Sequence, residues 1–153
     1  KNKIKLNNLL SKYFINQYFM PNIQLRLTKH IINFANTSID ISDGLLTDLD
    51  KMINTQKLSY KLYLNEVPIS KNLRQIIDLK KLSKINYISK GDDYQVLFTA
   101  PKNMSEAIRK ISIKNRIKLT KIGIIHSVGK KSSIVDHNNT NINIKNKGYF
   151  HQF

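Results

Sequence analysis

The sequence predicts a single α+β domain in which helices pack on a mixed β-sheet. Segments whose apolar residues recur at helical spacing alternate with segments in which apolar and polar residues alternate as in strands. No internal repeat at a fixed period is present. The 153 residues match the usual length of one domain, and hydrophobic residues, at 41%, suffice for a buried core.

The expected elements follow from these two periodicities. Helices are expected where apolar residues lie three and four positions apart, over residues 6–19, 23–35, 45–54, 73–79 and 104–114. Strands are expected over residues 38–42, 58–64, 94–99, 119–125, 132–136 and 142–144. The strands over 119–125 and 132–136 are expected to form a hairpin, and 87–91 to be a loop.

The formal net charge of +16 raises the possibility of nucleic-acid binding, because lysine and arginine neutralise phosphates. The lysines are scattered among abundant asparagine and isoleucine, however, as a compositionally biased genome would produce. A basic RNA- or anion-binding domain therefore stays a secondary alternative. The absence of cysteine fits a cytoplasmic protein, and no apolar run is long enough to span a membrane.

The scarce acidic residues are clustered. Six of the ten lie in two short stretches, as Asp40, Asp43, Asp48, Asp50, Asp92 and Asp93. Asp40 lies within the expected strand over residues 38–42, on the face that it shares with Ser42, and Asp43 stands at the turn where a helix begins. Neighbouring carboxylates repel unless a cation lies between them, and such oxygen ligands suit Mg²⁺ together with phosphate. The start of the helix adds N–H groups that favour phosphate oxygens, so a nucleotide and metal site is plausible.

A simpler interpretation of the same residues also exists. Asp43 is a favoured N-cap residue, and spacing alone favours the cap over the ligand. Asp48 and Asp50 are compatible with solvated helix positions. The Asp92-Asp93 pair is compatible with an ordinary loop before a strand.

Several landmarks in this order resemble the C-terminal half of the thiamine-monophosphate kinases, of the aminoimidazole ribonucleotide synthetase superfamily. They are residues 39–45 with Asp48-Leu49, then 68–70, 91–99, 122–123 and 148–149. The resemblance implies a three-layer α/β/α C-terminal domain with a mixed sheet over residues 21–153. Residues 1–20 would then be a connecting helix from a missing N-terminal domain, which agrees with a chain that starts at Lys1 without methionine.

The resemblance also implies roles at the first acidic stretch. Asp40 and Asp43 would be Mg²⁺ ligands, and Ser42 would contact ATP. The implied reaction is direct transfer of the γ-phosphoryl group of ATP to thiamine monophosphate. Catalysis would then come from positioning and charge neutralisation, without a covalent enzyme intermediate.

The substrate residues implied by the resemblance lie in the later landmarks. Asp92 or Asp93 would contact thiamine monophosphate, and Tyr149 would pack on it. The chain departs from the family pattern at two nearby positions, where Lys90 replaces a usual glycine and Gln95 a common glutamate. Its tail is also one residue longer than usual before the final phenylalanine.

The resemblance further implies that the chain works as part of a longer, homodimeric protein. Because the N-terminal domain bears most ATP and metal contacts in this superfamily, the isolated chain is expected to be inactive. Two alternatives remain open: another synthetase of the superfamily with a different substrate, and a truncated remnant with structural value only.

Overall fold

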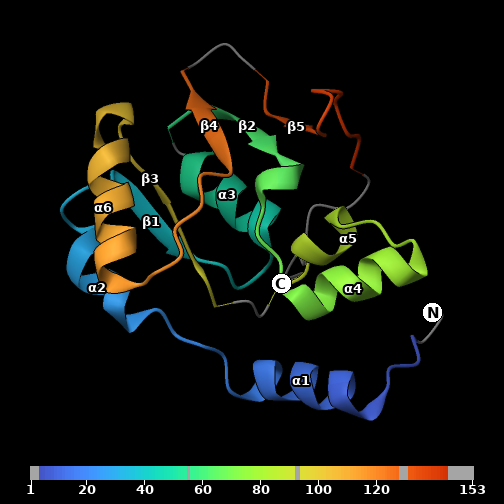
Figure 1. Cartoon of the computed structure of the whole chain (residues 1–153). Helices are drawn as coiled ribbons and strands as arrows, with labels where there is room; N and C mark the ends of the chain where they lie inside the picture. Colours follow the sequence, from blue (N-terminus) through green and yellow to red (C-terminus); the bar gives the residue numbers. More distant parts are fainter. Residues whose placement is uncertain (1–3, 55, 92–93, 128–130, 145–153) are drawn as a thin grey trace, which may run out of the picture.

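The computed structural model describes residues 4–54, 56–91, 94–127 and 131–144 (Figure 1). The helices in these ranges are α1 (Asn8–Phe19), α2 (Leu25–Ile31), α3 (Leu45–Asn54), α4 (Lys71–Lys80), α5 (Ile85–Ile88) and α6 (Ser105–Asn115). The strands are β1 (Thr37–Asp40), β2 (Ser59–Tyr63), β3 (Val96–Thr99), β4 (Gly123–His126) and β5 (Ser133–Val135). Two short 3-10 helices are also present in these ranges: η1 (Leu64–Glu66) follows β2, and η2 (Lys102–Met104) precedes α6.

The strands form two small sheets. β1 and β3 pair antiparallel, with Asp40 opposite Val96. In the second sheet β2 is central, antiparallel to β4 and parallel to β5. The predicted hairpin between the last two strands is therefore wrong, because β2 lies between them. Alternation of side chains predicts a strand but not its neighbours, and Tyr60 and Leu62 of β2 are only 3% and 1% exposed.

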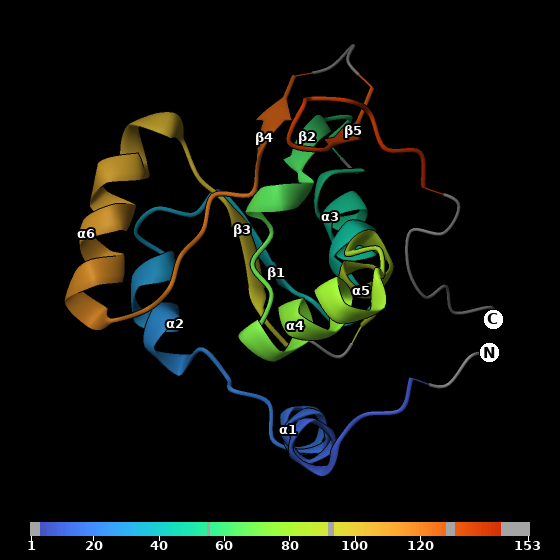
Figure 2. The ribbon, with the colours of Figure 1, turned by 45° about the vertical axis from the view of Figure 1, so that its right-hand side comes forward.

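Helices cover the strands on two sides, so the predicted three-layer α/β/α arrangement is confirmed (Figures 1 and 2). One apolar cluster joins α3 and α5 to β2 and to the Leu97 side of β3. A second, smaller cluster joins α2 and α6 to the opposite side of β3, through Val96 and Phe98. This division follows from the strand geometry, because successive side chains of β3 point to opposite faces.

Local sequence signals explain where several helices start and stop. α1 begins after Asn7, whose side chain accepts a hydrogen bond of 2.9 Å from the Leu10 N–H. α4 begins after Ser70, which caps the helix in the same way at 3.1 Å. Within the described ranges, no helix has both the length and the apolar character needed to cross a bilayer.

Two short segments differ from the prediction. The expected loop over residues 87–91 begins inside helix α5, whose Ile85 and Ile88 are buried. A single turn of helix leaves too few residues for its periodicity to be recognised. The expected strand over residues 142–144 does not form, and the chain there makes only an isolated bridge between Asn141 and Val135.

Helix α1 lies apart from the rest of the domain (Figures 1 and 2). None of its residues is buried. Large apolar side chains on and just beyond it are more than half exposed: Leu9, Ile15, Tyr18, Phe19 and Met20. Large exposed apolar patches usually mark interaction surfaces, which makes this helix a candidate for one.

Candidate functional site

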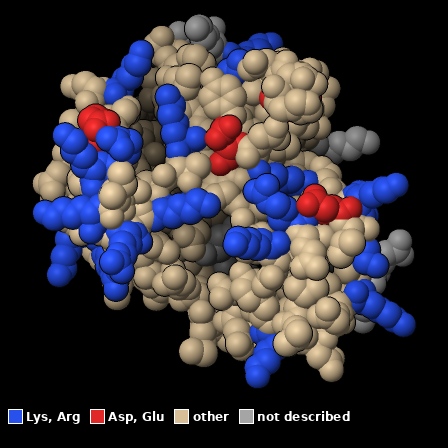
Figure 3. Space-filling view, viewed as in Figure 1, with Lys and Arg blue, Asp and Glu red and all other residues tan. Residues whose placement is uncertain are grey.

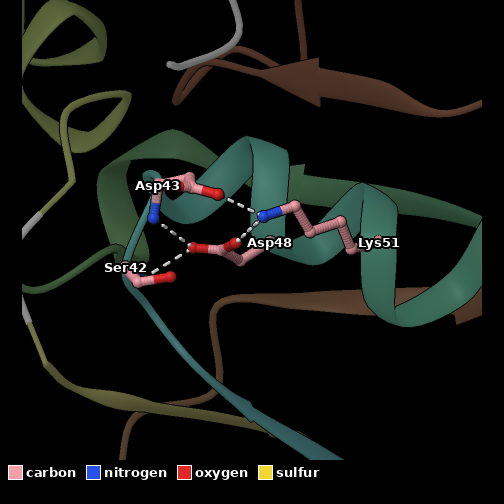
Figure 4. A network of polar contacts seen from close by, with 4 residues as sticks. All are labelled: Ser42, Asp43, Asp48 and Lys51. Carbon is pink, nitrogen blue, oxygen red and sulfur yellow. Dashed lines mark hydrogen bonds and ion pairs between the residues drawn. The ribbon is translucent and has the colours of Figure 1, made fainter. Parts of the chain in front are cut away.

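The candidate site is the turn between β1 and α3, and a buried carboxylate holds its backbone in place (Figure 4). Asp48, in the first turn of α3, is 0% exposed. Its Oδ2 accepts hydrogen bonds from the N–H groups of Ser42 and Asp43, both at 2.9 Å. Gly44 completes the turn with φ of +114°, a region that side chains disfavour.

This arrangement corrects one expectation from the sequence and narrows another. Asp48 is buried rather than solvated, because its carboxylate is consumed by the turn that it closes. The backbone N–H groups of Ser42 and Asp43 donate to Asp48, so these two donors are not available to a phosphate. A phosphate at this turn would therefore be held by groups other than these two, such as side chains, a metal ion or the first N–H groups of α3.

Lys51, one turn further along α3, bridges the two carboxylates of the site. Its Nζ donates to Asp48 Oδ1 at 3.0 Å and forms a close ion pair with Asp43 Oδ2 (Figure 4). The hydrogen bond to Asp43, followed by that to Asp48, raises the pKa of Lys51 above its ordinary value. The Lys51 side chain is 48% exposed, whereas those of Asp43 and Asp48 are 18% and 1% exposed.

The remaining residues assigned to the first acidic stretch face solvent. Asp40 ends β1 and is exposed, and Ser42 in the turn is exposed as well. In the described part of the chain, no three histidine or acidic side chains lie close enough together to hold a metal ion. The described residues thus offer two carboxylates, Asp40 and Asp43, near the turn between β1 and α3. They do not form a complete set of metal ligands.

The second acidic stretch reaches this turn through backbone contacts. A Cβ atom added at Gly91 would lie 1.9 Å from the Ser42 carbonyl oxygen, and one at Gly44 would lie 2.6 Å from the Ser89 oxygen. Beyond the stretch, the Tyr94 N–H donates to the Ile41 oxygen at 3.0 Å. The two stretches are therefore neighbours in the fold, although they lie far apart in the sequence and neither local pattern predicts the contact.

Asp92 and Asp93, which the sequence predicts to contact substrate, lie outside the described residues, as does Tyr149. The glycine that precedes the pair is described, and it packs against the Ser42 carbonyl. Asp92 and Asp93 come directly after Gly91 in the sequence. Their roles in substrate binding stay predictions.

Sequence reasoning missed the role of Asp50. This half-buried carboxylate hydrogen-bonds the hydroxyl of Tyr60 on β2, which is only 3% exposed. Burial, and then the neighbouring Asp50, raise the pKa of Tyr60 well above its ordinary value. The contact ties α3 to the second sheet, and the alternation of β2 indicates only that Tyr60 faces inward.

The basic side chains do not gather in one patch on the face of the molecule seen in Figure 3. Figure 3 shows Lys and Arg spread across this face, with a few acidic side chains among them. Such a spread is what a biased composition produces, whereas nucleic-acid binding surfaces usually gather their positive charge along one face.

Comparison with known proteins adds a family to this geometry. No protein-family model matches the chain. The thiamine-monophosphate kinase of Buchnera aphidicola subsp. Acyrthosiphon pisum is 30% identical over 153 residues, which are 99% of this chain and 46% of that protein. A solved structure described as "AaThiL complexed with AMPPCP and TMP" superposes with a TM-score of 0.70 at 24% identity, covering 98% of this chain and 44% of that one.

A more distant likeness defines the fold class. The crystal structure of E. coli HypE, a hydrogenase maturation protein, superposes with a TM-score of 0.63 at 10% identity, over 78% of this chain and 38% of that one. The chain thus has the aminoimidazole ribonucleotide synthetase-like fold. Within this class it belongs with the thiamine-monophosphate kinases, to which it is similar over nearly its whole length. It spans less than half the length of these curated relatives, at 46% and 44%.

Proposed function

We propose that this chain is the C-terminal half of a cytoplasmic thiamine-monophosphate kinase, which transfers the γ-phosphoryl group of ATP to thiamine monophosphate and yields thiamine diphosphate. The observation that carries the proposal is the turn between β1 and α3. Its backbone is fixed from inside by Asp48, and Asp40, Ser42 and Asp43 stand on it at the edge of the domain. Relatives with this activity in their names match the chain from end to end, and one related structure contains AMPPCP, an ATP analogue.

Magnesium would be held by Asp40 and Asp43. The donor set fits this ion, because both groups are carboxylates and Asp43 already pairs with a cationic group, the Lys51 ammonium. Bound magnesium would neutralise the phosphate charge that develops during transfer. Ser42 would hold ATP through its exposed hydroxyl, because its N–H is already bonded to Asp48.

Thiamine monophosphate would be contacted by Asp92 or Asp93 and covered by Tyr149. The packing of Gly91 on the Ser42 carbonyl supports this assignment, because it starts the acidic pair beside the proposed nucleotide turn. Transfer between two phosphates requires that donor and acceptor be held in line, which the closeness of the two stretches would provide.

The whole enzyme would need an N-terminal half, which would supply further ATP and metal contacts and the homodimer interface. Residues 1–20 would form the connection and residues 21–153 the C-terminal domain. Two observations support this division: α1 buries none of its residues, and the chain spans 46% of a similar kinase. The exposed apolar side chains of α1 would pack against that half, and the isolated chain would be inactive.

A chimeric enzyme tests the proposal. In it, this chain replaces the matching part of the Buchnera aphidicola kinase, and ADP release is measured with ATP, Mg²⁺ and thiamine monophosphate. We expect release that depends on thiamine monophosphate, and a loss of about 100-fold or more in kcat for Asp43→Asn. The isolated chain should release no ADP above background.

The controls separate the rival functions. A panel of superfamily substrates in the same assay would reveal another synthetase, and activity with a different acceptor alone would refute the kinase assignment. RNA affinity that falls steeply with salt, and that persists in Asp43→Asn but not in lysine variants, would favour a basic binding domain. A folded chimera without activity on any acceptor would leave a structural remnant as the better interpretation.

A further inference from the structure

Lys51 contacts one carboxylate oxygen of Asp43, the residue proposed above as a metal ligand. Its ammonium group contacts Asp43 Oδ2 and lies 3.0 Å from Asp48 Oδ1, so one cation serves both carboxylates (Figure 4). A divalent ion bound to the same oxygen of Asp43 would meet both steric overlap and charge repulsion from the ammonium. Both cations cannot share that oxygen at contact distance.

The two carboxylates that bind Lys51 differ in burial and in their other hydrogen bonds. Asp48 is buried and keeps two backbone donors on its other oxygen, so its position does not depend on Lys51. Asp43 lies at the surface side of the turn, with 18% of its side chain exposed. A shift of the ammonium away from Asp43 therefore leaves the turn closed.

Lys51 is also able to move at low cost. Its side chain is 48% exposed and has a flexible stem of four carbons. The ammonium group can therefore move into solvent while the stem stays against α3. Ion pairs with this degree of exposure contribute little net free energy, which makes them easy to exchange. A strongly hydrated divalent ion together with phosphate oxygens can compete with such a pair.

We propose that Lys51 is a tethered counter-ion, which neutralises Asp43 when no metal is bound and must leave that carboxylate when a divalent ion binds. The inference rests on the proposed function, since it takes Asp43 as a metal ligand. Lys51 acts as a positioning residue: it sets the threshold for metal binding and keeps the acidic turn from repelling itself when the metal is absent.

Metal titration of the chain tests this inference through binding rather than activity. Mn²⁺ affinity is measured from the free-ion signal in electron paramagnetic resonance, and broadening of the Ser42 and Asp43 amide resonances locates the site. We expect Lys51→Gln to bind Mn²⁺ about two- to five-fold more tightly than the unmodified chain, the range that the loss of an exposed ion pair allows. Lys110→Gln, which removes the same charge from exposed helix α6, is the matched control and should leave affinity unchanged.

A second measurement separates displacement from a general charge effect. In the unmodified chain, the Lys51 Cε resonance should shift during a Mg²⁺ titration, in step with the Asp43 amide. In Asp43→Asn this coupled shift should vanish. Because the measurement uses the unmodified chain, it remains decisive even where Lys51→Gln fails to fold.

The outcomes distinguish this inference from the proposed function. Tighter binding in Lys51→Gln together with the coupled Lys51 shift supports the counter-ion role. If Asp43→Asn weakens Mn²⁺ binding but Lys51→Gln does not strengthen it, or if the Lys51 resonance stays fixed at saturating Mg²⁺, the counter-ion role is wrong while the metal site stands. If Mn²⁺ broadens neither Ser42 nor Asp43 in any variant, the proposed metal site itself fails.

Discussion

The turn between β1 and α3 and the helix α1 show opposite relations to the rest of the domain. The turn is held by Asp48, which is 0% exposed, and by backbone contacts with the segment around Gly91 and Tyr94. α1 has a capped start and a regular backbone, yet none of its residues is buried. The backbone of the turn is therefore fixed by packing within the domain, whereas α1 buries no residue against the described part of the chain.

The strongest way to break this comparison is to remove the carboxylate that closes the turn. Asp48→Ala leaves the N–H groups of Ser42 and Asp43 without their acceptor. It also removes the hydrogen bond that Lys51 donates to Asp48. We expect a loss of about 3 kcal/mol in the free energy of unfolding, measured by urea denaturation.

Asp136→Ala is the matched control for that change. Asp136 Oδ1 also accepts from two backbone N–H groups, those of Asn138 and Thr140, but in an exposed turn where water can replace it. Its loss should cost about 1 kcal/mol. Equal losses in the two variants would contradict the importance assigned to burial at Asp48.

A smaller effect is expected where the second acidic stretch meets the turn. Gly91→Ala places a Cβ atom 1.9 Å from the Ser42 carbonyl oxygen, so one of the two backbone segments must shift. We expect a loss of about 2 kcal/mol in urea denaturation, together with altered amide resonances at Ser42 and Asp43. Lys90→Ala, at the exposed neighbouring position, should change neither, and a silent Gly91→Ala would show that the contact is not required.

Tyr60 provides a pH-dependent test of how α3 is attached. Its pKa is raised in the folded chain by burial and by Asp50, so folding favours the protonated hydroxyl. That contribution is complete below the unfolded pKa of about 10 and is lost as the pH rises above it, because only the unfolded chain then ionises readily.

Tyr60→Phe should accordingly cost about 1 kcal/mol at pH 7, through loss of the hydrogen bond to Asp50. The difference from the unmodified chain should shrink above about pH 10. Urea midpoints between neutral and alkaline pH measure this, with Tyr63→Phe on the same strand as control. A difference that stays constant with pH would contradict the assignment.

The smallest effect is expected in α1. Leu9, at 82% exposure, should be replaceable by serine within about 0.5 kcal/mol of the stability of the isolated chain. In the chimera with an N-terminal half, the same change should lower the thermal midpoint, because Leu9 would then be covered. A large loss in the isolated chain would show that α1 already packs within this domain.

The sequence predicts well those features that depend on neighbouring residues. The apolar positions over residues 45–54 give α3 its observed bounds, Leu45–Asn54, because its buried face repeats at helical spacing. Clustering of the acids also places Asp40 and Asp43 at the junction of β1 and α3, where the structure has them. The order of the strands was not predictable in this way, since the position of β2 between β4 and β5 depends on contacts distant in the sequence.

The candidate site shows the same division between local and distant information. Its position between a strand and a helix follows from periodicity, and Asp40, Ser42 and Asp43 do lie there. The burial of Asp48 was not predicted, because a carboxylate four residues into a helix pattern is usually solvated. The bridge by Lys51 was missed for a related reason: among so many lysines, only side-chain geometry separates one that pairs from those that do not.

The position of β3 has a consequence for how the domain melts. This strand of four residues presents Leu97 to the larger apolar cluster and Phe98 to the smaller one. Neither cluster can lose β3 without exposing the other, so heat should disrupt both cores in a single cooperative transition rather than in separate steps.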